Sequence, residues 1–108
     1  MNQTKAGCSA KWELRLLSGA QTALREADGQ RALALLDQHA KSCPWATFWE
    51  ERSAARILAL CLLHREQQAM TEAAKFASLA PRSPQLARLR SSCAAAAVLS
   101  SAKTEGER

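Results

Sequence analysis

The sequence has almost none of the residues from which β-sheets are built. Its 108 residues include one valine, one isoleucine, five threonines and no tyrosine. Strands depend on β-branched and aromatic side chains that pack on a pleated surface. Alanine and leucine, with 23 and 15 copies, are strong helix formers because they lose little side-chain entropy in a helix. The composition therefore predicts an all-α protein with one small domain.

Long apolar runs and blocks of like charge are also missing. No stretch approaches the ~20 apolar residues of a membrane-spanning helix, and the N-terminus lacks the apolar segment of a signal peptide. As written, the sequence predicts a cytoplasmic protein, with a periplasmic or envelope location open if the chain is the end of a longer protein. The net charge of +5 is scattered, which argues against nucleic acid as a partner. Binding of nucleic acid or an anionic surface through Arg82, Arg88 and Arg90 remains an alternative.

The cysteines are not spaced as metal ligands. Zinc sites usually take their ligands in close pairs on a turn, and no such pair of Cys or His occurs, so we expect no metal site. In a reducing compartment the four cysteines are expected to be buried free thiols, with the first an ordinary thiol in a flexible leader. They are Cys8, Cys43, Cys61 and Cys93, separated by 35, 18 and 32 residues.

The sequence shows no constellation typical of an enzyme. The four glycines are never clustered into a phosphate-binding loop. Neither His39 nor His64 has a neighbouring nucleophile at a suggestive spacing. We expect His39 to be a half-buried packing residue and His64 to be solvated at a turn. The prediction is a non-enzymatic protein without a cofactor.

Capping signals divide the chain into five helices. Ser9 and Asp28 are suitable N-caps for the first two, and Thr47 with Glu50 matches a capping box for the third. The third helix is apolar around so much of its circumference that we expect it to pack from two sides. Residues 1–8 are predicted to be a flexible leader, 9–100 the domain and 101–108 a disordered tail. The expected helices run from after Ser9 to about Ala27, from Gly29 to about Ser42, from the Thr47 cap to about His64, from there to before Pro81, and onward from Ser83-Pro84.

Two helical hairpins follow the same plan when the chain is aligned with itself at an offset of 37 residues. Ala32 then matches Ala69, and Pro44 matches Pro81. This pattern resembles the tetratricopeptide repeat, whose period is about 34 residues. The segments LALLDQHAKSCP and KFASLAPRSPQLARLRSSC are similar to short two-repeat modules near the C-termini of bacterial envelope and regulatory proteins.

The resemblance implies two antiparallel helical hairpins in a right-handed stack with a C-terminal capping helix. It places Ala27 and His64 at the turn position that is usually glycine. It also implies a protein–protein interaction adaptor or scaffold, with a groove between the first helices of the repeats that binds an extended peptide. The small residues at which helices would approach closely are Ala20, Ala32, Ala69 and Ala77.

Three of the five aromatic residues lie within five positions: Trp45, Phe48 and Trp49. Tryptophan is enriched at binding hot spots because it offers a large area and a polar N–H at a small entropy cost. One interpretation is therefore an aromatic edge that binds a partner protein. The other is that these rings fill the gap between the two hairpins, where an alanine-rich core needs bulk.

Arg15, Arg52 and Arg56 lie on the first helices of the two units. If they line the groove, they suit an acidic peptide or a C-terminal carboxylate, because guanidinium pairs with carboxylate through two hydrogen bonds. The alternative is a solvated face on which they pair with Glu50 and Glu51.

The C-terminal helix suggests a third class of function. Ala94 to Ala97, Val98 and Leu99 make it apolar on every side, which a lone capping helix should not be. A self-associating structural module, dimerising through this helix, is the alternative that this pattern favours.

Overall fold

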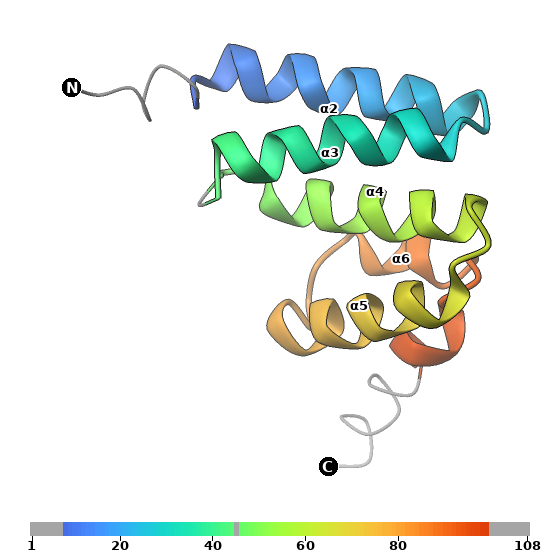
Figure 1. Cartoon of the computed structure of the whole chain (residues 1–108). Coiled ribbons are helices and arrows are strands. Elements are labelled where there is room, and N and C mark those ends of the chain that lie inside the picture. Colours follow the sequence, from blue (N-terminus) through green and yellow to red (C-terminus); the bar gives the residue numbers. More distant parts are fainter. Residues whose placement is uncertain (1–7, 45, 100–108) are drawn as a thin grey trace.

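The protein is a stack of helices in which consecutive long helices run antiparallel (Figure 1). The computed structural model describes residues 8–44 and 46–99, and these ranges contain no strand. The all-α prediction is confirmed. The helices are α2 (Ala10–Arg25), α3 (Gly29–Ser42), α4 (Trp49–Leu62), α5 (Glu66–Leu79) and α6 (Leu86–Leu89).

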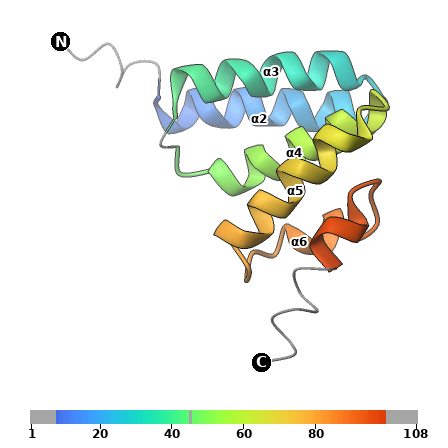
Figure 2. The same ribbon diagram turned by 60° about the horizontal axis from the view of Figure 1, so that its bottom comes forward.

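Helix α4 is the centre of the stack. It contacts α2, α3, α5 and α6, which confirms the expectation that the most apolar helix packs from more than one side. Its buried residues include Ala55 and Ala59 on the side of α2 and α3, and Ile57 and Leu60 in the cluster shared with α5. Figure 2 shows α2 and α3 side by side, with α5 crossing obliquely to them.

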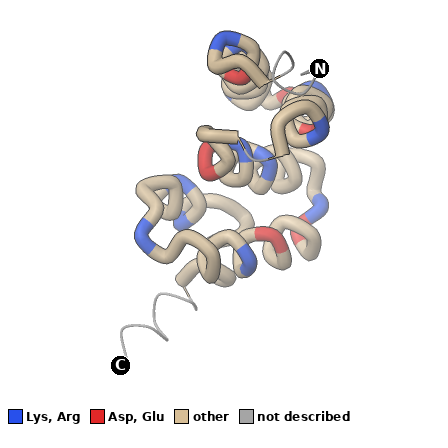
Figure 3. Tube along the Cα trace, turned by 90° about the vertical axis from the view of Figure 1, so that its left-hand side faces the viewer, with Lys and Arg blue, Asp and Glu red and all other residues tan. Residues whose placement is uncertain are grey.

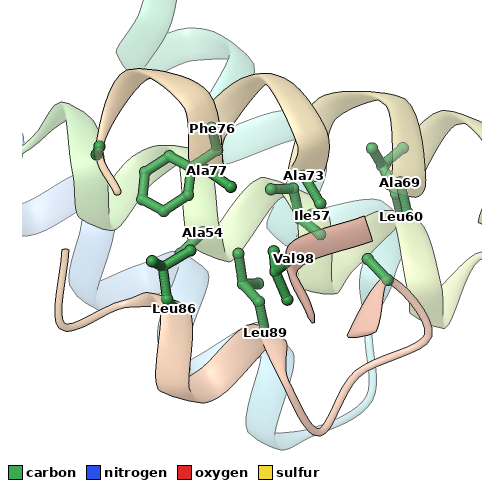
Figure 4. Close-up of a cluster of buried hydrophobic side chains, with 12 residues drawn as sticks. Ala54, Ile57, Leu60, Ala69, Ala73, Phe76, Ala77, Leu86, Leu89 and Val98 are labelled. Atoms are coloured by element: carbon green, nitrogen blue, oxygen red, sulfur yellow. The ribbon is translucent and has the colours of Figure 1, made fainter. Parts of the chain in front are cut away.

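The main core lies between α4, α5 and the C-terminal segments. Ile57, Phe76, Leu89 and Val98 point into it from four different parts of the chain (Figure 4). Burying a hydrophobic side chain of this size contributes about 1.5–3 kcal/mol, so these few residues supply much of the hydrophobic stabilisation. The four alanines expected at close approaches between helices are all buried, at 0–3 % exposure: Ala20, Ala32, Ala69 and Ala77.

The turns between paired helices have the same geometry 37 residues apart. Ala27 and His64 both have positive φ, 58° and 59°. In the first turn the Asp28 N–H donates to the Ala23 carbonyl at 2.8 Å, and in the second the Arg65 N–H donates to the Leu60 carbonyl at 2.9 Å. This is the Schellman arrangement, in which a left-handed residue ends the helix. Non-glycine residues therefore occupy positions that favour glycine.

Side-chain caps begin the first two helices as expected. Ser9 Oγ accepts the Trp12 N–H at 3.1 Å, and Asp28 Oδ1 accepts the Arg31 N–H at 3.1 Å. The capping box predicted for the third helix is wrong. Helix α4 begins at Trp49, one residue later than a cap at Thr47 implies, and its N-cap residue Phe48 makes no side-chain capping bond.

The predicted fifth helix is interrupted. Ser83 Oγ accepts the Gln85 N–H at 3.1 Å, but α6 has only four residues. Ser92 then donates to the Leu89 carbonyl and accepts the Ala94 N–H, at 2.7 and 3.0 Å. A serine that bonds to the backbone on both sides competes with helix continuation, and helix resumes only over 95–99.

The interruption changes the environment of the apolar C-terminal segment. Ala94 and Val98 are buried in the chain's own core, while Leu99 is 49 % exposed. The segment thus folds back on α4 and α5 with most of its apolar side chains covered. Within the described ranges, none of the helices has the length and apolar character needed to cross a membrane.

The cysteines are paired, so the expectation of free thiols is wrong. Cys8 bonds to Cys43 and Cys61 to Cys93, with Cα atoms 5.2 and 5.6 Å apart, distances typical of disulfides. Spacing along the chain gave no indication of this, because hairpin packing brings distant positions together. Cys8, expected in a flexible leader, is fixed to the end of α3. The rest of that leader, residues 1–7, and the tail at 101–108 lie outside the described residues.

Candidate functional site

A groove with a volume of about 550 Å³ runs along α4, between α3 and α5. A second pocket of about 370 Å³ adjoins it beside the start of α4. The two share three residues: Trp49, Arg52 and Leu79. The apolar wall of the groove comes from all three helices, and its charged residues are Asp37, Arg52, Arg56, Glu72 and Lys75.

The structure brings together three of the six residues singled out from the sequence. Trp49, Arg52 and Arg56 all line the groove. Phe48 packs instead against the cluster of α2, α3 and α4 residues that contains Leu17. Arg15 lies apart on α2, in a shallow pocket with Lys11 and Trp12. Trp45 falls outside the described residues.

Trp49 packs in the core and also lines the groove. Its ring meets the buried Phe76 ring edge to face, with centroids 5.9 Å apart and an interplanar angle of 64°. Such a pair contributes about 0.5–1.5 kcal/mol beyond area burial. The half-buried ring also lines both pockets. Trp49 therefore fills core space and forms part of the groove wall.

A row of hydrogen-bonded polar side chains in the protein interior holds Arg52 in the groove wall. Glu13 on α2 is 5 % exposed and His39 on α3 is fully buried. The His39 Nε2 lies 3.1 Å from Glu13 Oε1, and its Nδ1 lies 3.2 Å from Arg52 Nη1. Arg52 Nη1 also donates to the Cys43 carbonyl at 2.9 Å. His39 is thus a fully buried link between three helices, and the expected half-buried packing role is wrong.

The contacts of His39 indicate which of its ring nitrogens carries the proton. A guanidinium can only donate, so Nδ1 of His39 must accept from Arg52 and carries no proton. Nε2 then carries the proton and donates a hydrogen bond to Glu13 Oε1. The contacts therefore correspond to a neutral His39, and Glu13 Oε1 is the acceptor of its N–H. Burial lowers the pKa of Arg52, and the carboxylate of Glu13 partly offsets this.

Arg56 bridges the two sides of the groove. Its Nε donates to Glu72 Oε1 on α5 at 2.9 Å, and its Nη1 forms an ion pair with Asp37 on α3. Burial alone would lower the pKa of Arg56, but Glu72 and Asp37 outweigh it and raise the pKa. The recorded partners of Arg52 and Arg56 are therefore not Glu50 and Glu51, the partners that the solvated-face interpretation expected.

The groove lies on a different side of α4 from the one expected. The tetratricopeptide resemblance placed it between the first helices, here α2 and α4. Arg52 and Arg56 instead face α3 and α5. Arg88, just after α6 begins, donates to Gln21 of α2 at 3.1 Å, and so links α6 to α2. The sequence identified two of the arginines but not their direction, and nothing in it indicated the buried chain through Glu13.

Other kinds of site find little support in the described part of the chain. Basic positions lie on several helices and turns with acidic positions among them (Figure 3). No three His, Cys, Asp or Glu side chains of the described residues are grouped so as to hold a metal ion. No protein-family model, curated protein or solved structure matches this chain. The groove along α4 is therefore the feature from which a function is inferred.

Proposed function

We propose that this protein is a non-enzymatic interaction module, similar to a tetratricopeptide repeat, that binds a segment of another protein in the groove along α4. The observation that carries the proposal is the combination of exposed apolar surface with a fixed cation. Leu79 is 64 % exposed on the rim of both pockets, next to Trp49 and Arg52. Binding hot spots are enriched in tryptophan and arginine at the centre of an apolar surface.

The backbone supports the repeat relationship in this proposal. Helices α3 and α5 each have 14 residues, and their bounds differ by 37 positions at both ends. Their C-cap residues, Cys43 and Ala80, have the same φ of −136° and similar ψ of 69° and 65°. Each donates its N–H to the residue four positions earlier, at 2.8 Å. Helical repeat modules stack units of one plan, so the matching geometry of α3 and α5 supports the repeat relationship.

The disulfides favour an oxidising compartment as the place where the module works. Disulfides form and persist in secreted, periplasmic or surface-exposed proteins and are rare in the cytoplasm of most organisms. Both bonds link segments more than 30 residues apart. The periplasmic or envelope location is therefore the better proposal than the cytoplasmic one.

The test compares two exposed leucines. Leu79 lies on the groove, whereas Leu14, 52 % exposed, lies on α2 away from it. The oxidised full chain would be panned against a phage display of random peptides, together with the Leu79→Asp and Leu14→Asp variants. We expect peptides that bind the wild type and Leu14→Asp but not Leu79→Asp. Recovery of no peptide, or equal binding to both variants, would contradict the proposal.

A further inference from the structure

Arg52 differs from Arg56, the other arginine that lines the groove, by the kind of partner it has. Arg56 is neutralised by Glu72 and Asp37. The contacts of Arg52 are an imidazole nitrogen and a backbone carbonyl, both uncharged. Among the described residues, no carboxylate lies within ion-pair distance of it. The two acids of the groove are thus already matched. The carboxylate of Glu13 acts on Arg52 from beyond His39, so the guanidinium can still attract an anion on its groove side.

The geometry of these contacts selects the kind of anion. Both hydrogens of Arg52 Nη1 are directed to protein acceptors, one to His39 and one to Cys43. The Nε–H and the adjacent Nη2–H remain, and they point in parallel from one edge of the guanidinium. Two parallel donors match the two oxygens of a carboxylate. The contacts with His39 and Cys43 also hold the side chain in place before a ligand arrives, which reduces the entropy cost of binding.

Apolar surface lies on both sides of this cation. The smaller pocket adds Pro44 and Ala46, while the larger groove continues to Ile57 and Phe76. Arg52 belongs to both. A ligand whose chain ended at Arg52 would cover only one of them. A carboxylate within a continuous segment, with an apolar side chain before it and another after it, covers both.

We infer that the groove recognises an internal Asp or Glu of a partner protein, flanked on both sides by large apolar residues, with the carboxylate on Arg52. This inference rests on the proposed binding function and specifies its partner. The carboxylate is bound where apolar walls limit water, so its loss should weaken binding on the order of 10- to 100-fold.

The experiment uses two peptide libraries on the oxidised full chain. In one the random segment is internal to the displayed protein, and in the other it ends in a free C-terminus. We expect the internal library to enrich Asp or Glu between large apolar residues. An enriched peptide would then be synthesised with acetylated and amidated ends, together with a copy carrying Gln or Asn at the acidic position. The acidic copy should bind at least tenfold more tightly.

Variants of the protein complete a double-mutant cycle. In Arg52→Gln the preference for the acidic peptide should disappear, whereas Arg15→Gln, on α2, should keep it. If Arg52→Gln does not fold, as judged by circular dichroism, Arg52→Lys replaces it, and the preference should shrink because the two parallel donors are lost.

The outcomes separate this inference from the function on which it rests. Peptides that need Leu79 but lack a preferred acid would overturn the inference and leave the binding function intact. Enrichment only of peptides with a free C-terminal carboxylate would also overturn it. If none of the recovered peptides depends on Leu79 for binding, both the inference and the binding function are overturned.

Discussion

Arg52 donates to Nδ1 of His39 across 3.2 Å, and this contact makes a buried histidine a neutral link between an arginine and a carboxylate. Because the other ring nitrogen faces Glu13 at 3.1 Å, a single imidazole joins α2, α3 and α4. Buried polar groups are costly unless each finds a partner. Glu13, His39 and Arg52 each have one, so the groove cation is held by side chains of the core itself.

The first prediction concerns the proton of His39. We expect the imidazole to be neutral, with its proton on Nε2, because Arg52 has no acceptor to offer Nδ1. Two-bond ¹H–¹⁵N correlation spectra of the folded protein at neutral pH distinguish the two tautomers. His64, exposed at a turn, serves as an internal reference. A proton on Nδ1 of His39 would contradict the contacts described.

The second prediction concerns the carboxylate at the end of this chain. Glu13→Ala removes the acceptor of a fully buried N–H, which should lower the free energy of unfolding by about 1–3 kcal/mol. The matched control is Glu26→Ala at an exposed position, where a change within about 0.5 kcal/mol is expected. Urea denaturation of both variants measures the difference. Equal stability of the two would mean that the Glu13–His39 contact contributes nothing.

Much of the fold was predictable because local rules act over a few residues. Ser9 and Asp28 cap helices through side chains that reach the backbone three positions ahead, and such short-range bonds do not depend on the rest of the fold. The prediction that four alanines lie buried where helices approach closely was also confirmed. The capping box at Thr47 failed because helix α4 begins at Trp49, and a ring that packs on Phe76 constrains where the helix can start.

The site was predictable only in part because its properties depend on contacts far apart in sequence. Arg52 and Arg56 were identified as functional candidates, but the side to which they point is set by how α4 packs between α3 and α5. His39 occupies the position equivalent to Phe76, 37 residues on, so a packing role was the natural expectation. Its burial became possible because Glu13, 26 residues away, provides an acceptor. The disulfide partners were likewise decided by the stacking of hairpins.

A third prediction concerns two glycines, Gly29 and Gly19, at which one helix lies close to another. A Cβ at Gly29 would lie 3.0 Å from the Ala59 carbonyl oxygen, a backbone atom that cannot move without displacing α4. Gly29→Ala should therefore destabilise the protein by about 1–3 kcal/mol. At Gly19 the added Cβ would lie 3.1 Å from the tip of the Leu35 side chain. Gly19→Ala should be neutral or stabilising by up to about 1 kcal/mol, since alanine is the better helix former.

Thermal melts of these two glycine variants give the comparison. The expected order of melting temperature places Gly29→Ala clearly below the wild type and Gly19→Ala at or above it. If both variants lose stability equally, the backbone contact at Ala59 is not what requires glycine.

A fourth prediction uses the two turns that share left-handed geometry. Ala27→Gly and His64→Gly should each stabilise the protein, by about 1 kcal/mol at Ala27, because glycine adopts positive φ without steric cost. Histidine tolerates this region better than alanine, so the gain at His64 should be smaller. Ala34→Gly, at an exposed position within α3, is the control and should destabilise by about 1 kcal/mol. Chemical denaturation of the three variants checks the signs.

The fifth prediction concerns the disulfides. The Cys61–Cys93 bond closes a loop that contains α5 and α6, so its removal frees the C-terminal segments from α4. In the chain-entropy account, a loop of this length contributes about 3–4 kcal/mol. The double variant Cys61→Ala/Cys93→Ala should lose this stability and show faster amide exchange in α6 and over 95–99. Exchange in α2 should remain protected, because Cys8–Cys43 is still intact there. Peptide mapping of the non-reduced protein tests the pairing directly. Any other pairing would contradict the structure, and four free thiols would contradict the proposed oxidising compartment as well.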